Sequence, residues 1–166
     1  YRSFKQGLVT RKSYLKALSN CLENAKQPVL VHVNSFMDLP NELEKNEFDL
    51  NNLITREELI QNQTQEQINR FKDGHVKTLF TTKCSRGIDF PGEKCNSIII
   101  TKYPYPNVQG LFWKILKKEK PNHYWEFYFD KARRELLQKI YRGVRSKQDY
   151  LLLLSPDSRI INARLS

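Results

Sequence analysis

Three polar side chains near the C-terminal end of the chain, Gln138, Arg142 and Arg145, are spaced four and three residues apart. On a helix this spacing places them on one face. A buried face with two guanidinium groups would need charged partners, so the face more readily points at phosphates. The planar fork of arginine binds phosphate oxygens bidentately and keeps its charge at any working pH. The spacing therefore predicts a helix whose polar face contacts phosphate groups.

A second set of candidate residues shares a position at or just after the end of an expected strand. In a parallel sheet the carboxyl ends of the strands form one edge, which is where ligands bind. Gly87 allows the backbone to approach a ligand closely. Asp89 can accept a hydrogen bond from a ribose hydroxyl or from the arginines, although Arg86 and Asp89 could instead form a local ion pair of little energetic value. The candidates at this edge are Ser35, Thr81, Thr82, Arg86, Gly87, Asp89 and Tyr103.

Two motifs that a complete nucleotide hydrolase needs are missing from the sequence. There is no GxxxxGK[ST] loop to hold phosphates, and no acidic pair follows a strand to hold Mg²⁺. The chain therefore has arginines suited to a γ-phosphate but nothing to hold the nucleotide. We expect it to complete an active site that another domain supplies.

The elements that must position these residues alternate between helices and strands. Thr10 is expected to cap a first helix that Pro28 stops, and residues 64–73 to form a helix with a capping box. Strands are expected at 28–35, 76–82, 97–101 and 150–154, with a short one at 53–55, while 37–52 are loop or ragged helix and the tail is irregular. The apolar run 150–154 is typical of a strand buried on both faces. This order predicts an α/β fold with a doubly wound parallel sheet and helices on both faces.

The segment 103–134 differs from the rest of the chain in being aromatic and basic. It holds both tryptophans, and helices are expected at 110–120 and from Pro121 towards Arg145. It is interpreted as a helical insertion outside the sheet of a single domain that spans residues 1–166. For Trp113, at helical spacing with other apolar residues, packing is favoured over contact with a ligand. For His32, inside a strand, a buried structural role is favoured over catalysis.

Charge and cysteine content narrow the class of protein. The net charge is +10, and residues 111–147 carry 11 Lys or Arg against 4 Asp or Glu. Such a local patch fits a polyanion such as a nucleic acid, and fits equally a solvated basic surface. The three cysteines give no disulfide or metal-site pattern and are expected to be reduced thiols. With no signal peptide and no long apolar run, the chain is expected to be a piece of a larger intracellular protein, cytoplasmic or nucleoid/nuclear.

Three segments together carry a family resemblance: TTKCSRGIDFPG from residue 81, SIIITKYPYPN from residue 97, and QKIYRGVRSKQDYLLLLSPDSR from residue 138. In this order they resemble the C-terminal, second RecA-like domain of superfamily 2 helicases, closest to the XPD/DinG group of DNA helicases. VLVHVNSF resembles motif IV, residues 81–89 motif V, and Gln138 with its arginines motif VI. Arg86 and Tyr141 depart from the group's pattern, where Glu and Gly are usual.

The resemblance implies an ATP-dependent DNA helicase in which two RecA-like domains enclose ATP. ATP with Mg²⁺ would be bound mainly by the N-terminal helicase domain of the same protein, with Arg142 and Arg145 as arginine fingers. Gln138 would act with these arginines in catalysis, and Gly87 and Asp89 would help to bind the nucleotide. Gln138 and Asp89 would also couple nucleotide state to the strand-binding loops, and the isolated chain would be inactive. An iron–sulfur cluster, where the group has one, belongs to the other domain.

The resemblance also implies contacts with single-stranded nucleic acid, most simply DNA, by a monomer that is not membrane-bound. Ser35, Thr81, Thr82, Arg86 and Tyr103 would contact the strand. The basic segment would line its path, with Tyr105 and Trp113 as further candidates for stacking. A non-catalytic scaffold that binds nucleic acid or a partner remains the alternative. A Rossmann-type metabolic domain lacks its GxGxxG turn in this sequence.

Overall fold

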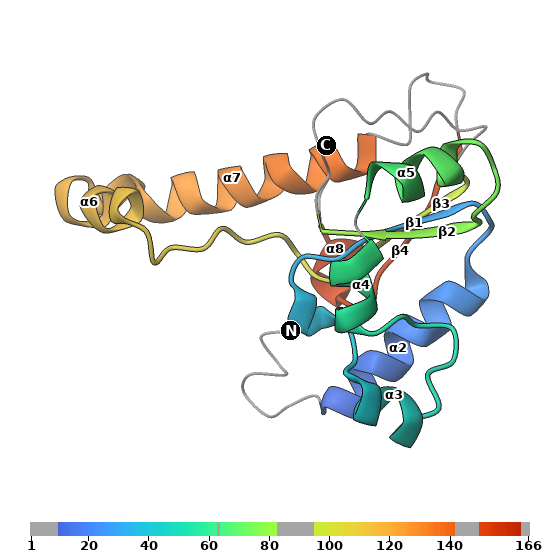
Figure 1. The fold of residues 1–166 in the computed structure, drawn as a ribbon. Helices are drawn as coiled ribbons and strands as arrows, with labels where there is room; N and C mark the ends of the chain where they lie inside the picture. The colour runs from blue at the N-terminus through green and yellow to red at the C-terminus, as the bar shows by residue number, and fades with distance from the viewer. Residues whose placement is uncertain (1–9, 63, 83–94, 142–149, 164–166) are drawn as a thin grey trace.

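A four-stranded parallel sheet forms the centre of the computed structural model, which describes residues 10–62, 64–82, 95–141 and 150–163. The strands lie in the order β2 (Thr78–Thr81), β1 (Val29–His32), β3 (Ser97–Ile100), β4 (Leu152–Leu154) (Figure 1). In the register, Leu30 lies beside both Leu79 and Ile98. Because β2 lies on one side of β1, and β3 followed by β4 on the other, the sheet is doubly wound. The α/β prediction is confirmed, and the fold is consistent with a RecA-like domain.

One face of the sheet packs against the N-terminal helices. Helix α2 (Arg11–Asn24) begins where the hydroxyl of Thr10 accepts a hydrogen bond from the backbone N–H of Ser13, as the sequence predicted. Its apolar side packs on the odd-numbered residues of β1 and on Ile99. The 3₁₀ turn η1 (Phe36–Asp38) and helices α3 (Glu42–Glu47) and α4 (Arg56–Asn62) complete this side. The core residues on this face are Tyr14, Leu15, Leu18, Val29, Val31, Val33, Leu39, Leu50, Leu53, Leu59 and Ile99.

The opposite face packs against α5 (Gln65–Lys72), α8 (Ser158–Ile161) and the last turns of the long helix α7 (Pro121–Tyr141). Phe71, Leu136 and Ile160 from these three helices cover the even-numbered residues of β1 and β3. Since side chains of a strand alternate between faces, two covered faces need strands that are apolar throughout. All four residues of β1 and of β3 are buried, and the expectation that His32 is buried is confirmed by its 2% exposure.

A two-helix arm formed by α6 (Leu111–Glu119) and α7 extends away from the sheet (Figure 1). Trp113 is only 6% exposed and packs edge-on against Tyr124 and Tyr128 of α7, so the prediction of a packing role is confirmed. Leu136, fully buried, fixes the other end of α7 to the sheet. The description of 103–134 as an insertion within a single domain stays a prediction.

Three expectations for local structure were wrong. Residues 53–55 are not a strand, because Thr55 exchanges hydrogen bonds with Glu58 and caps the start of α4. The strand expected at 150–154 begins at Leu152 and is half-exposed, since β4 has a strand neighbour on one side only within the described residues. The tail is not irregular throughout, because Asp157 caps the short helix α8.

Candidate functional site

The carboxyl edge of the sheet brings together the predicted residues that the structure describes there. Ser35, Thr81 and Tyr103 follow or end three adjacent strands, β1, β2 and β3, and Thr82 comes directly after β2. The backbone N–H of Val33 donates to the carbonyl of Thr81 at 2.8 Å, which fixes the two strand ends to one another. The spatial arrangement expected from the sequence is therefore present for these four residues.

Ser35 lies in a hydrogen-bonded turn. It is the N-cap of η1, where its Oγ accepts a hydrogen bond from the backbone N–H of Met37 at 3.3 Å. Its own backbone N–H donates to a carboxylate oxygen of Asp38 at 2.9 Å. Accepting the Met37 bond leaves the hydroxyl proton able to donate. The half-buried Ser35 can thus offer one O–H donor at the sheet edge without rearrangement of its loop.

Asp38, which sequence reasoning missed, connects this turn to the neighbouring strand. Its Oδ2 accepts from the hydroxyl of Thr101 at 3.0 Å, and Thr101 Oγ1 accepts in turn from the backbone N–H of Asn34 at 3.1 Å. Burial raises the pKa of Asp38, against the opposing effects of the Lys102 charge and of hydrogen bonds from Thr101 and Ser35. The S-x-x-D spacing of a capping box was the signal in the sequence that could have found it.

A second link, also missed from the sequence, joins the segments that leave β3 and β4. Asp157 accepts a hydrogen bond from the backbone N–H of Tyr103 at 2.8 Å and binds Arg159 through both carboxylate oxygens, at 2.6–3.1 Å. Burial alone would raise the pKa of Asp157, but the hydrogen bonds from Arg159 and Tyr103 outweigh it and hold the pKa below its ordinary value. The guanidinium of Arg159 also lies 5.2 Å from the ring centroid of Tyr105. This pair therefore positions the residues that follow β3.

We expect Asp157→Asn to lower the free energy of unfolding by about 2 kcal/mol at pH 7, because it leaves Arg159 without its buried carboxylate. A depressed carboxyl pKa contributes stability above the unfolded value of about 4, and that contribution is lost as the pH falls through the folded pKa. The gap between wild type and variant should therefore shrink on acidification. Urea unfolding at pH 7 and at about pH 3 measures both effects.

The matched control is Asp130→Asn, which breaks the exposed Asp130–Arg134 pair of α7, 2.8 Å apart. An exposed pair of this kind contributes about 0.5 kcal/mol or less. Equal losses in the two variants would contradict a positioning role for Asp157.

Gln138 is the one predicted phosphate-facing residue that lies within the described chain. It is exposed on α7, two residues after the buried Leu136. The other predicted residues of the motif V and motif VI segments, Arg86, Gly87, Asp89, Arg142 and Arg145, lie outside the described residues. Their roles stay predictions.

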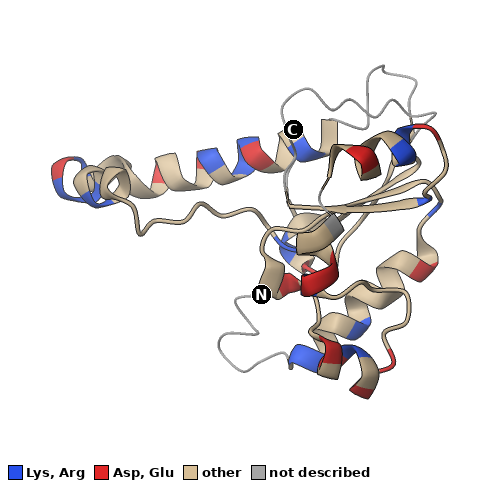
Figure 2. Ribbon diagram, in the orientation of Figure 1, with Lys and Arg blue, Asp and Glu red and all other residues tan. Residues whose placement is uncertain are grey.

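The arm carries the exposed basic and aromatic surface of the described chain. Lys and Arg residues lie along α6 and α7 (Figure 2), and Phe112, Trp125, Phe127 and Phe129 are 42–57% exposed. Among the side chains expected to stack on bases, Trp113 is buried, and the ring of Tyr103 packs against the sheet core and Tyr105. Trp113 is therefore not available for stacking, while the exposed aromatic side chains were not singled out from the sequence.

Within the described residues, no three His, Cys, Asp or Glu side chains are grouped so that they could hold a metal ion. Cys95 is buried, Cys21 is half-buried, and both are free thiols. In the same part of the chain, no helix has the length and apolar character that crossing a membrane requires.

Comparison with known proteins gives a family match over most of the chain. A family model described as the helicase C-terminal domain matches residues 18–166. The ATP-dependent DNA helicase CHL1 of Candida glabrata is 32% identical over 97 residues, covering 50% of this chain and 12% of that protein. The ATP-dependent DNA helicase DinG of Photobacterium profundum is 30% identical over 98 residues, covering 56% of this chain and 14% of that protein. The matched region is thus about an eighth of the length of these relatives.

Proposed function

The chain belongs to the helicase C-terminal domain family, and from this we propose that it is the second motor domain of an ATP-dependent DNA helicase of the XPD/DinG type. The observation that carries the proposal is that one family match, residues 18–166, spans all three motif-like segments. The described parts of the motif IV-like and motif V-like segments end at the same edge of the sheet. That edge is where a doubly wound domain presents its ligand-binding groups.

In the proposed division of labour, the N-terminal helicase domain of the same protein holds ATP and Mg²⁺, and this domain closes on it. Arg142 and Arg145 would then bind the γ-phosphate and stabilise the charge that develops during its transfer. Gly87 and Asp89 would help to bind the nucleotide, and Gln138 and Asp89 would link nucleotide state to the strand-binding loops. Because the chain has no phosphate-holding loop of its own, it is expected to show no ATP hydrolysis in isolation.

The proposed nucleic-acid track runs along the carboxyl edge of the sheet. Ser35, Thr81 and Thr82 are small hydroxyl residues at adjacent strand ends, suited to donate hydrogen bonds to phosphate oxygens. Arg86 would add a positive charge to this track, and Tyr103 would contact the strand on the side of the track next to the arm. The protein would act as a monomer on single-stranded DNA, in the cytoplasm and nucleoid or in the nucleus.

The proposal predicts that this chain binds single-stranded DNA with a strong dependence on salt. Each phosphate contact made by a Lys or Arg releases counterions and contributes about −0.7 to the slope of log K against log salt. Replacing the exposed Lys114 and Lys118 of α6 by glutamine should weaken binding and make that slope shallower. Titrating a labelled oligothymidylate at several salt concentrations, with fluorescence anisotropy as the readout, measures the slope.

The matched control is the exposed pair Lys12 and Lys16 on α2, which has the same spacing and the same change in charge. Helix α2 lies away from the arm (Figure 1) and should leave the slope unchanged when both lysines become glutamine. Equal effects of the two pairs would identify the basic arm as a general solvated surface and would count against a DNA track there.

A further inference from the structure

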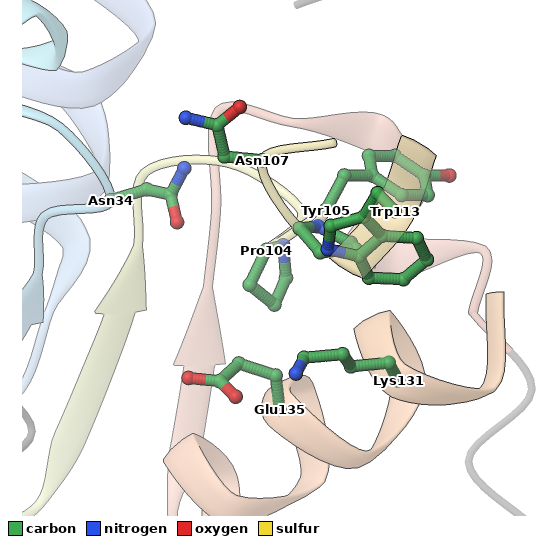
Figure 3. Close-up of a pocket in the computed structure, with 8 residues that line it drawn as sticks. Asn34, Pro104, Tyr105, Asn107, Trp113, Lys131 and Glu135 are labelled. Atoms are coloured by element: carbon green, nitrogen blue, oxygen red, sulfur yellow. The ribbon is translucent and has the colours of Figure 1, made fainter. Parts of the chain in front are cut away.

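A pocket of about 300 Å³ opens where the arm leaves the carboxyl edge of the sheet. Asn34, two residues after the end of β1, lies on one side, and residues 104–107, which follow β3, form the next wall. Helix α7 closes the far side with Lys131 and Glu135 (Figure 3). In the strand order β2–β1–β3–β4 the chain reverses its direction of winding between β1 and β3. The pocket therefore lies at the topological switch point, where open α/β sheets bind their ligands.

The walls of the pocket combine flat apolar groups with amides. Pro104 and Pro106 supply pyrrolidine rings that can pack on a ligand, while Tyr105 and the largely buried Trp113 only contribute aromatic carbon to the wall. The side-chain amide of Asn34 forms no hydrogen bond within the described part of the chain, and an amide can offer both donors and an acceptor to a ligand. An amide pairs with the donor and acceptor edge of a nucleobase, and apolar rings pack on its face.

The charges at the rim argue against a phosphate group as the occupant. Lys131 and Glu135, one helical turn apart, place one positive and one negative group at the pocket. Phosphate sites use arginines, lysines and helix N-termini without a facing carboxylate. A neutral, planar, hydrogen-bonding ligand fits this balance better. The volume is at the small end of the range of about 300–1,000 Å³ for small-ligand sites, which suits a single base rather than a whole nucleotide chain.

The pocket is held in shape before any ligand arrives. The backbone N–H of Asn34 donates to Thr101 Oγ1 at 3.1 Å. The ring of Tyr105 stacks on Tyr128 of α7, with the ring centroids 5.4 Å apart and the planes 4° apart. The guanidinium carbon of Arg159 lies 5.2 Å from the centroid of the Tyr105 ring. Because these groups are fixed by the fold, little conformational freedom would be lost on binding.

We propose that this pocket binds one unstacked nucleobase from the single strand that runs along the sheet edge, so that the domain binds the strand through a base as well as through phosphates. This inference rests on the proposed function, because the strand is what delivers the base. The chemistry recognised is that of a nucleobase, which a free mononucleotide could also present, and the test separates these two sources.

The test uses the full-length protein and a single-stranded overhang beside a duplex, which fixes the register, without ATP so that the strand does not move. One abasic residue is placed at each overhang position in turn, and affinity is measured by fluorescence anisotropy. We expect one position to show a loss of about tenfold and the others little change. Asn34→Ala should weaken binding of the intact strand by about three- to tenfold and add no further loss at that one abasic position.

Two variants keep the result interpretable. Asn122→Ala, at an exposed position in the first turn of α7, removes an asparagine outside the pocket and should bind like wild type. Asn107→Ala removes the second amide of the pocket from an exposed turn, where its Oδ1 accepts from the backbone N–H of Gln109 at 3.0 Å. Its loss should also vanish at the same abasic position, and this variant replaces Asn34→Ala if the latter fails to fold.

The possible outcomes distinguish a base-binding pocket, a site for a free nucleotide, and failure of the proposed function. A uniform response to abasic residues, with both asparagine variants binding normally, overturns the base pocket and leaves the proposed function standing. Competition by dTMP or dAMP that depends on Asn34, without any position effect, assigns the pocket to a free nucleotide and overturns the strand claim. Failure of the wild-type protein to bind single-stranded DNA overturns the proposed function itself.

Discussion

Replacing Arg142 or Arg145 by alanine in the full-length protein should lower the rate of ATP hydrolysis by about 10³-fold or more, the scale known for arginine fingers. A finger acts on charge that develops in the transition state, so its loss lowers turnover far more than ground-state affinity. Binding of ATP and of DNA should therefore stay close to wild type. Steady-state ATP hydrolysis, together with separate binding titrations for ATP and DNA, measures the difference.

Two further substitutions sharpen this prediction. Lysine at either position should restore little activity, because a point charge cannot reproduce the bidentate fork of a guanidinium. Gln138→Ala should cost less, since it removes a neutral contact from an exposed position on α7. A gradient of effect from arginine to lysine to alanine, with a smaller loss at Gln138, would match the proposed roles.

The opposing interpretation is structural. Arg142 and Arg145 could pair with carboxylates such as Glu135 or Asp149 and only hold the end of the helix in place. In that case the alanine variants would unfold several degrees lower and lose DNA binding in proportion to activity. Thermal unfolding of the same variants distinguishes the two, and a parallel loss of stability, binding and turnover would remove the finger assignment.

The strands and long helices could be predicted because their signals are local. The complete burial of β1 and β3 follows from short runs that are almost entirely apolar, and α2 follows from a capping threonine and a helical apolar stripe. The prediction failed where two local signals competed. Residues 53–55 have strand propensity, but the reciprocal hydrogen bonds of Thr55 and Glu58 begin a helix there. The apolar run of β4 predicted a buried strand, whereas its place at the edge is set by the sheet order.

The site was predictable only in part, because its supporting contacts join distant residues. Asp38 meets Thr101 across 63 positions of sequence, and Asp157 meets Tyr103 across 54. No local sequence pattern predicts contacts between residues so far apart in the chain. The pocket beside Asn34 likewise exists only once α7 lies against the segment that follows β3. Sequence patterns located the sheet edge, while the groups that shape it required the fold.

The second large expected effect is activation of ATP hydrolysis by single-stranded DNA in the full-length protein. If the strand binds across both motor domains, it binds the closed arrangement better than the open one and shifts the population toward closure. Closure is what would bring Arg142 and Arg145 to the γ-phosphate held by the other domain. Turnover should therefore rise several-fold with added strand and fall back when raised salt releases it.

Whether this domain is half of an ATP-driven motor is tested by the ATP hydrolysis rate of the full-length protein, with and without single-stranded DNA, compared with the rate of this chain alone. We expect single-stranded DNA to stimulate hydrolysis by the full-length protein, and we expect no hydrolysis from this chain by itself. Hydrolysis by the isolated chain would contradict the division of labour between two domains. The absence of hydrolysis in the full-length protein under both conditions would contradict the motor assignment and favour a non-catalytic scaffold.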